Sequence, residues 1–192
     1  MIDLEKLLIE CRLPGPAVIW EVGANHPNQV HTANLHLLAG RVELFEPHPY
    51  FAEELRKHFA TKKNVLVHEV ALVDWNGEAQ LRDAGCSSYL DGVKSPRTTD
   101  GPPPENVIPV QCRHVHLYDR GDIDVLAIDT EGSEWNVIKN LRSEPYLICV
   151  EMAWPQGGYV NPHADEIRAW MSKERYQLVD SDGQDEVYAI LP

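Results

Sequence analysis

The sequence has 192 residues, of which 43% are hydrophobic, and this suits one globular domain with a core that needs no disulfide or structural metal. The net charge of −13 is spread along the chain, without the clustered Lys and Arg that bind a phosphate backbone, so we expect no nucleic-acid partner. No apolar run approaches the roughly 20 residues that span a bilayer, and the acidic N-terminal stretch is unlike a signal peptide. With four dispersed cysteines and no C-x-x-C pair, these features predict a cytoplasmic protein without a membrane partner.

Hydrophobic periodicity in the first half of the chain predicts helices that alternate with strands. An N-terminal helix, Ile2–Cys11 within residues 1–14, ends before a Pro-Gly-Pro segment that cannot continue it. The predicted elements that follow are the strand Ala17–Val22, the helix Gln29–Ala39, the strand Arg41–Phe45, the helix Pro49–Phe59, the strand Asn64–Leu72 and a short returning strand, Glu78–Arg82.

The alternation resumes after residues 83–106, which are rich in Gly, Pro, Ser and Thr and are predicted to form an irregular active-site loop. The later predicted elements are the strand Ile123–Ile128, the helix Ser133–Leu141, the strand Tyr146–Met152, the helix His163–Glu174 and a hairpin of Tyr176–Val179 with Glu186–Leu191. Near-continuous apolar strands predict an α/β, Rossmann-like fold in a single domain, residues 1–192. We expect a mostly parallel twisted sheet with helices on both faces and an antiparallel C-terminal edge hairpin.

Polar residues follow five successive predicted strands. In open α/β sheets, ligands bind beyond the carboxyl ends of the strands. The residues at these ends are Glu21, Gly23 and Asn25; Glu46 and His48; Glu69, Ala71 and Asp74; Asp129 and Glu131; and Glu151. Because apolar strands lead to them, their convergence predicts a binding or active site at this edge of the sheet.

The turn after the first strand favours a nucleoside cofactor that has no pyrophosphate. Gly23 permits a sharp turn and a close approach of the backbone to a ligand. Glu46 lies at the distance along the chain where a carboxylate binds both ribose hydroxyls. A pyrophosphate needs several bare amides near the start of a helix, and the G-x-G-x-x-G pattern is missing here. The sequence therefore favours S-adenosylmethionine over NAD.

Five short motifs between residues 17 and 152 resemble, in order and spacing, the FkbM family of methyltransferases. The motifs are Glu21-Val22-Gly23-Ala24-Asn25, Phe45-Glu46-Pro47-His48-Pro49, Ala71-Leu72-Val73-Asp74 with Gly77, Ile128-Asp129-Thr130-Glu131-Gly132 with Glu134, and Val150-Glu151. The resemblance implies a class I methyltransferase fold, S-adenosylmethionine as the cofactor, and O-methylation of a hydroxyl on a small molecule or glycan.

The resemblance also implies roles for individual residues. The cofactor-binding residues that it implies are Glu21 and Gly23 at the methionine end, Glu46 at the ribose, Ala71 near the adenine, and Asn25 and Ser88 in the same site. Asp129 and Glu131 would face the transferring methyl group or the acceptor.

Three carboxylates from neighbouring strand ends, Asp129, Glu131 and Glu151, are the expected catalytic residues. One of them could take the proton of an acceptor hydroxyl, or together they could bind a divalent cation that lowers the pKa of that hydroxyl. The metal is the less favoured alternative, because the same carboxylates can bind the ammonium of the cofactor or a substrate amine, and we assign no metal ligand. His26 and His48 are the nearest histidines and are alternative general bases.

One departure from the FkbM pattern favours the first of two alternative functions. His26-Pro27 stands where the family usually has an aliphatic residue and a glycine, which makes the loop stiffer. The first alternative is a regulatory protein that binds the cofactor without turnover, and the second, less favoured, is an NAD-dependent enzyme.

Overall fold

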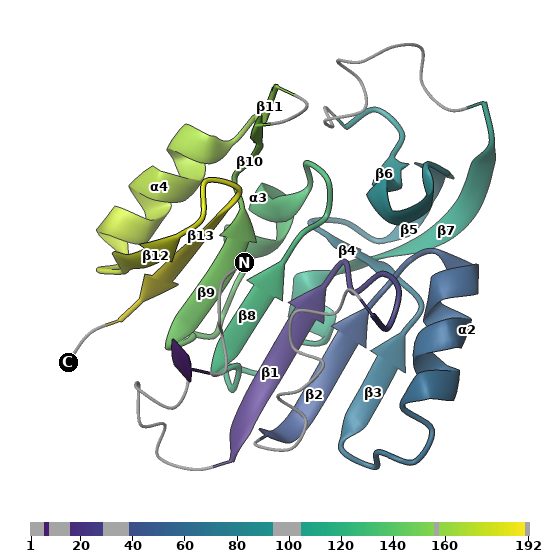
Figure 1. Ribbon diagram of the computed structural model, residues 1–192, viewed down its shortest axis with the longest axis horizontal. Coiled ribbons are helices and arrows are strands. Elements are labelled where there is room, and N and C mark those ends of the chain that lie inside the picture. The colour runs from purple at the N-terminus through teal and green to yellow at the C-terminus, as the bar shows by residue number, and fades with distance from the viewer. Residues whose placement is uncertain (1–5, 8–15, 29–38, 94–104, 156–157, 191–192) are drawn as a thin grey trace.

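The computed structural model describes residues 6–7, 16–28, 39–93, 105–155 and 158–190. Its main element is a seven-stranded sheet in the order β12-β13-β9-β8-β1-β2-β3 (Figure 1). The strands in that order are Gln177–Ser181, Asp185–Ala189, Leu147–Glu151, Val125–Ile128, Ala17–Val22, Ala39–Phe45 and Val65–His68. Strands β9 to β3 run parallel, whereas β13 and β12 form an antiparallel hairpin at the edge. The predicted Rossmann-like sheet and its C-terminal edge hairpin are therefore confirmed.

Strand β1 is the middle one of the five parallel strands, and it is apolar on both faces. Ile19 and Trp20 are both fully buried, and successive side chains of a strand point to opposite faces. Glu21 is in register with Leu44 of β2 and with Ala127 of β8. The carboxyl ends of these three strands therefore meet at one level, where a ligand can contact all of them.

Helices cover both faces of the sheet, as predicted. One face carries Ile19 and packs against Leu55 and the adjoining Phe59. The other face carries Trp20 and packs against Ile138 and Ile167. The helices that supply these contacts are α2 (Pro49–His58) on the first face, and α3 (Glu134–Ile138) and α4 (Ala164–Lys173) on the second.

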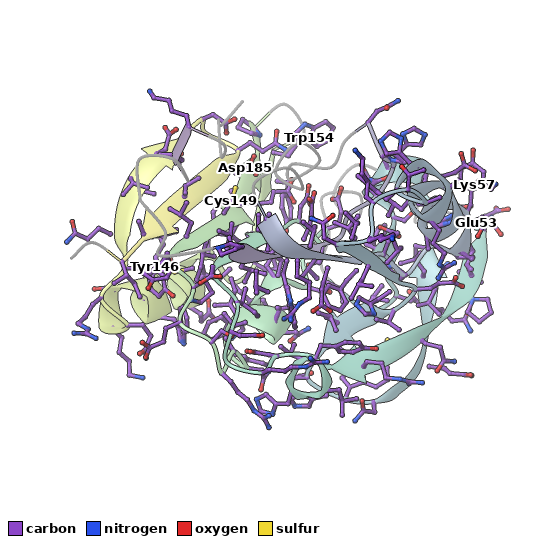
Figure 2. The ribbon with its side chains drawn as sticks, turned by 90° about the horizontal axis from the view of Figure 1, so that it is seen from below. Glu53, Lys57, Tyr146, Cys149, Trp154 and Asp185 are labelled. Carbon is purple, nitrogen blue, oxygen red and sulfur yellow. The ribbon has the colours of Figure 1, made fainter. Side chains whose placement is uncertain are left out.

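Helix α2 follows the ordinary rules of helix ends. Pro49 opens it, and the ring of His48 accepts a hydrogen bond from the Tyr50 N–H at 3.2 Å. Figure 2 shows Glu53 and Lys57 on its outer surface, where they form an exposed ion pair one turn apart at 3.8 Å. The apolar residues on the other side of the helix are therefore free to pack on the sheet.

A second, four-stranded sheet lies beyond the carboxyl ends of β1, β2 and β3 (Figure 1). Its order is β4-β7-β5-β6, with bounds Ala71–Val73, Val107–His114, Gly77–Arg82 and Tyr89–Leu90. Val73, Leu81, Val110 and Cys112 form a separate small core in it. A short ribbon of β10 (Ala153–Trp154) and β11 (Tyr159–Val160) follows β9.

The structure corrects the prediction of one strand over Asn64–Leu72. The segment forms β3, which pairs with β2, and β4, which pairs with β7 in the second sheet. Apolar residues occur on both sides of Glu69, so periodicity does not mark the change of sheet. The predicted strand Glu78–Arg82 is β5, but it pairs with β7 and β6 and does not return along β3.

Some predicted elements fall on residues outside the described ranges. These are most of the helix Ile2–Cys11, nearly all of the helix Gln29–Ala39, and residues 94–104 of the predicted loop. The described part of residues 83–106 holds a 3-10 turn at Gly85–Ser87 and strand β6, so it is more regular than predicted. Among the described helices, none combines the length and the apolar character that a membrane crossing requires.

Asp119 joins the turn before β8 to the turn before β9. It is 1% exposed and accepts hydrogen bonds from the N–H groups of Gly121, Arg142 and Ser143 and from the Ser143 hydroxyl. Burial on its own would raise the pKa of Asp119, but these hydrogen bonds outweigh it and lower the pKa below its ordinary value. The ionised side chain therefore stabilises the entry to both strands.

Candidate active site

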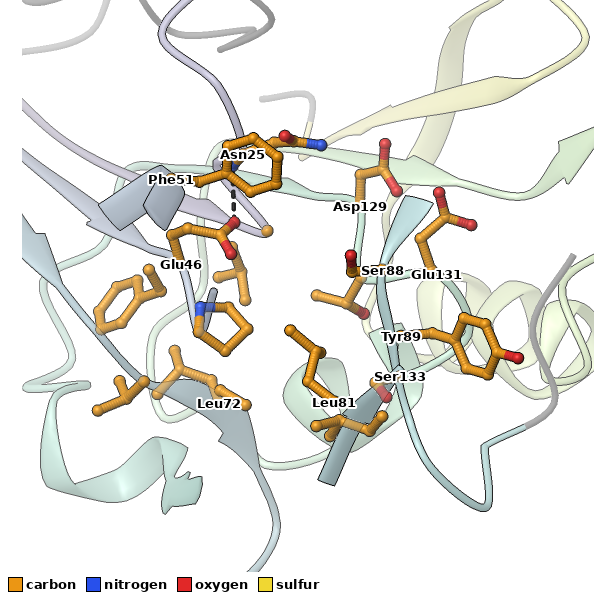
Figure 3. A pocket seen from close by; sticks show the side chains of 18 of the residues that line it. Asn25, Glu46, Phe51, Leu72, Leu81, Ser88, Tyr89, Asp129, Glu131 and Ser133 are labelled. Atoms are coloured by element: carbon orange, nitrogen blue, oxygen red, sulfur yellow. Dashed lines mark hydrogen bonds between the residues drawn. The ribbon is translucent and has the colours of Figure 1, made fainter. Parts of the chain in front are cut away.

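A pocket opens at the carboxyl ends of β1, β2 and β8, under the second sheet. It contains about 1030 Å³ of space, counted with its open mouth. Figure 3 shows Leu72, Leu81 and Tyr89 on the wall formed by the second sheet and its neighbouring turns. The two sheets together therefore enclose the position at which the sequence predicts a ligand.

Seven of the nine predicted site residues line this pocket, namely Gly23, Asn25, Glu46, Ala71, Ser88, Asp129 and Glu131. Glu21 and Glu151 do not line it. Glu21 is buried and lies on the same face of β1 as Ile19, which packs towards α2. Glu151 is buried behind Asp129 at the end of β9.

Gly23 provides the close approach of β1 to β8. Its φ is +84°, and its N–H and that of Ala24 both donate to the carbonyl of Phe45, at 2.9 and 3.1 Å. A Cβ added at Gly23 would lie 1.7 Å from the carbonyl oxygen of Asp129, a distance that no side chain tolerates. Only glycine fits both the backbone angle and the space.

Glu46 and Asn25 form one polar corner of the pocket, as the dashed line in Figure 3 shows. The two carboxylate oxygens of Glu46 accept hydrogen bonds from the backbone N–H groups of Asn25 and His48, each with an N···O distance of 2.7 Å. The Asn25 side chain donates to the carbonyl of Cys86 at 2.6 Å and so joins the first turn to the second sheet. Asn25 has a φ of 55°, which asparagine adopts more readily than most residues.

Burial controls the charge of Glu46, which is 6% exposed. Burial, with a smaller effect from the charge of Asp129, raises the pKa of its carboxyl, the two N–H donors lower it, and the net value is about 7. A ligand that presents hydroxyl donors would therefore favour the ionised form of Glu46.

A second group of carboxylates lies across the pocket from Glu46 (Figure 3). It comprises Asp129 and Glu131, which line the pocket, and Glu134 and Glu151, which are buried behind them. One oxygen from each of Asp129, Glu134 and Glu151 lies within 4.8 Å of the other two. Burial raises the pKa of Glu151, and the charges of Asp129, Glu131 and Glu134 raise it further, so the Glu151 carboxyl holds a proton in the absence of a cation.

Glu134 organises the loop after β8, a role that sequence analysis did not assign to it. Its side chain is 0% exposed. One oxygen accepts from the Thr130 N–H at 2.8 Å, the Thr130 hydroxyl at 3.0 Å and the Gly132 N–H at 3.0 Å. The other accepts from the Asn161 amide at 2.8 Å. An acid in the first turn of a helix was the available signal, because it attracts the N–H groups there.

Asn161 and Tyr159 were also missed, because they follow β9 in a segment without periodicity. The Asn161 amide donates to Glu134 and, at 3.0 Å, to the carbonyl of Glu151, which fixes the two acids relative to each other. Burial and then the charges of Glu134 and Glu151 raise the pKa of Tyr159, so its hydroxyl stays protonated. Both residues therefore belong to the surroundings of the carboxylate group.

Neither candidate histidine lines the pocket. The ring of His48 caps α2 and lies 3.6 Å from the Asp83 carboxylate. The ring of His26 accepts from the Asn28 N–H and lies edge-on to Phe51, with ring centres 6.5 Å apart. These contacts give both histidines a structural role.

Solved structures of several methyltransferases share this fold. The structure resembles that of a methyltransferase dependent on S-adenosylmethionine from Aquifex aeolicus, with a TM-score of 0.52 at 10% identity, over 98% of this chain and 90% of that one. It also resembles an O-methyltransferase dependent on S-adenosylmethionine from Thermotoga maritima, with a TM-score of 0.51 at 12% identity, over 99% of this chain and 65% of that one. A putative RNA methyltransferase from Pyrococcus horikoshii matches with a TM-score of 0.53 at 9% identity, over 97% and 79%. At these identities the likeness shows the fold, which is Rossmann-like as in class I methyltransferases.

The sequence itself gives the family. Residues 21–178 match the model of the methyltransferase FkbM domain, which is more than half of the chain. The protein belongs to the FkbM methyltransferase family. The comparison with curated proteins found no match.

Proposed function

We propose that the protein transfers the methyl group of S-adenosylmethionine to a hydroxyl of a small neutral molecule or sugar. The observation that carries the proposal is the charge of the pocket: among its described lining residues the charged ones are Glu46, Asp129 and Glu131, and no Lys or Arg is present. A sulfonium cofactor is attracted to such a lining, whereas an acceptor that carries phosphate groups is repelled. This argues for an uncharged acceptor and against a nucleic acid.

The residues of the pocket fit the parts of this cofactor. The two backbone groups that bond to the Glu46 carboxylate are both donors, and ribose hydroxyls would add donors of the same kind. Ala71, Leu72 and Ser88 form a mostly apolar wall suited to the adenine ring. Asp129 lies at the opposite side and can attract the ammonium or the sulfonium. Gly23 packs closely against the Asp129 carbonyl and has no side chain, so the backbone between Glu46 and Asp129 is accessible to the cofactor.

The bound cofactor supplies an electrophilic methyl group, and the protein has to align an acceptor and manage its proton. Asp129 and Glu131 are the two carboxylates of this group that line the pocket, and we propose that they bind the acceptor hydroxyl. Either of these two carboxylates can accept the proton of that hydroxyl. Glu134 and Asn161 position this group from behind.

Isothermal titration with S-adenosylmethionine tests the cofactor assignment. We expect saturable binding of one cofactor per chain and at least about tenfold weaker binding by Glu46→Ala, since a charged hydrogen-bonding partner is lost. The matched control is Glu53→Ala on the outer surface of α2, which should bind like wild type (Figure 2). Binding weaker than about 1 mM by wild type would contradict the proposal.

A panel of acceptors tests the transfer. With S-adenosylhomocysteine release as the readout, we expect turnover with polyols, sugars or phenols and none with phosphorylated sugars or RNA. If the protein binds the cofactor but releases no S-adenosylhomocysteine with any acceptor, the result would instead support the alternative of a regulatory protein, which the His26-Pro27 departure suggests.

A further inference from the structure

The carboxylates behind the pocket form a compact cluster from three different elements. Asp129 follows β8, Glu134 is the first residue of α3, and Glu151 ends β9. One oxygen of each lies within 4.8 Å of the other two. Ligand oxygens around a small hard cation such as Mg²⁺ are separated by about 3 to 4 Å. The cluster is therefore close to the size of a cation site.

Two buried polar atoms, one in the cluster and one outside it, lack a partner among the described residues. Glu151 is 4% exposed, and its Oε2 accepts no hydrogen bond. The hydroxyl of Tyr159, a residue 3% exposed and outside the cluster, also makes none. Tyr159 stands two residues before Asn161, whose amide donates to Glu134 and to the carbonyl of Glu151. Buried polar atoms normally have hydrogen-bond partners. A buried hydroxyl near carboxylates that it does not contact therefore indicates that another group lies between them.

We propose that Asp129, Glu134 and Glu151 bind one divalent cation, of the Mg²⁺ or Mn²⁺ type, at the edge of the pocket. Carboxylate oxygens are the ligands that these ions prefer. We assign the unpartnered Tyr159 hydroxyl to a water molecule on the ion. Because Asp129 also lines the pocket, open coordination positions face the space where an acceptor hydroxyl would lie.

Charge and depth favour a divalent ion over a substrate ammonium. Three carboxylates carry up to three negative charges, and one ammonium would leave two of them uncompensated in a buried place. Glu134 is fully buried and Glu151 nearly so, and an ion of atomic size reaches them where an alkylammonium would need a wider opening.

The experiment titrates Mn²⁺ into chelator-treated, cofactor-free protein and follows the free Mn²⁺ signal by electron paramagnetic resonance. We expect one bound Mn²⁺ per chain with a Kd below about 1 mM, and a rise in Tm with Mn²⁺ concentration. Glu151→Gln should weaken binding at least about tenfold. Its chelated form should keep the wild-type circular dichroism spectrum, because glutamine has the shape of the protonated acid.

The matched control is Glu78→Gln, an exposed acid of β5 whose side chain bonds Gln111 at 2.8 Å, and it should bind Mn²⁺ like wild type. Tyr159→Phe should weaken binding severalfold without lowering the Tm of the chelated protein. If Glu151→Gln does not fold, Asp129→Asn replaces it. Lack of stoichiometric binding by wild type, or unchanged binding by the cluster variant, would overturn the site. The cofactor titration is separate, so this result does not decide the proposed function.

Discussion

The raised pKa of Glu46 predicts that ribose binding depends on pH near neutrality. The two N–H groups at the Glu46 carboxylate are donors, as ribose hydroxyls are, so the ligand should bind the ionised form. With a pKa of about 7, that form is a tenth of the population at pH 6 and nearly all of it at pH 8, which corresponds to about tenfold tighter binding at pH 8. The measurement is isothermal titration with 5′-methylthioadenosine, which keeps the ribose hydroxyls and has no ionisable amine.

The same carboxyl makes the free protein less stable as the pH rises. The native state keeps a proton that the unfolded chain releases near the ordinary pKa of 4.5, so stability falls between that pH and about 7. The difference corresponds to at most about 3 kcal/mol in the free energy of unfolding. Glu46→Gln cannot ionise and should flatten both profiles. A wild-type affinity that is flat from pH 6 to 8, or an equal slope in the variant, would refute the argument.

Three further predictions concern stability, each measured by urea denaturation. Gly23→Ala should cost about 3 kcal/mol or more, because its Cβ meets a carbonyl, whereas Gly121→Ala, with φ +81° and open space, should cost about 1 kcal/mol. Asn161→Asp should cost about 3 kcal/mol at pH 8, because a carboxylate replaces the donor at Glu134. Asp119→Ala should cost about 3 kcal/mol at neutral pH. Because the native pKa of Asp119 is lowered, that stability is present above pH 4 or so and is lost as the pH falls through the native pKa.

The sequence predicted the main sheet because its strands have the simplest pattern. Ala17–Val22 and the strand at 125–128 are short, apolar and covered on both faces, so length and composition identify them. The ends of these strands then predicted the pocket by a rule of fold geometry, and this is why Gly23, Glu46 and Asp129 line it.

The second sheet and the support of the site were not predictable in the same way. Strand β7, Val107–His114, contains Pro109 and alternates only partly between buried and exposed residues. Its pairing with β5 joins segments about 30 residues apart, across the residues expected to be a loop. Glu134, Tyr159 and Asn161 act through tertiary hydrogen bonds and buried charges, which no local pattern encodes. Glu21 was predicted from its place before Gly23, but side-chain alternation turns it to the other face of β1.

The position of β1 between β2 and β8 has a kinetic consequence. Both neighbours pair with β1 in parallel, yet β8 follows β1 by more than 100 residues along the chain. The residues that line the pocket likewise range from Val22 to Ser133. Long-range parallel pairing is slow to form and occurs late in folding. A ligand of this pocket can therefore bind only after the central pairing is complete. It should slow the unfolding of the domain while leaving the rate of its folding unchanged.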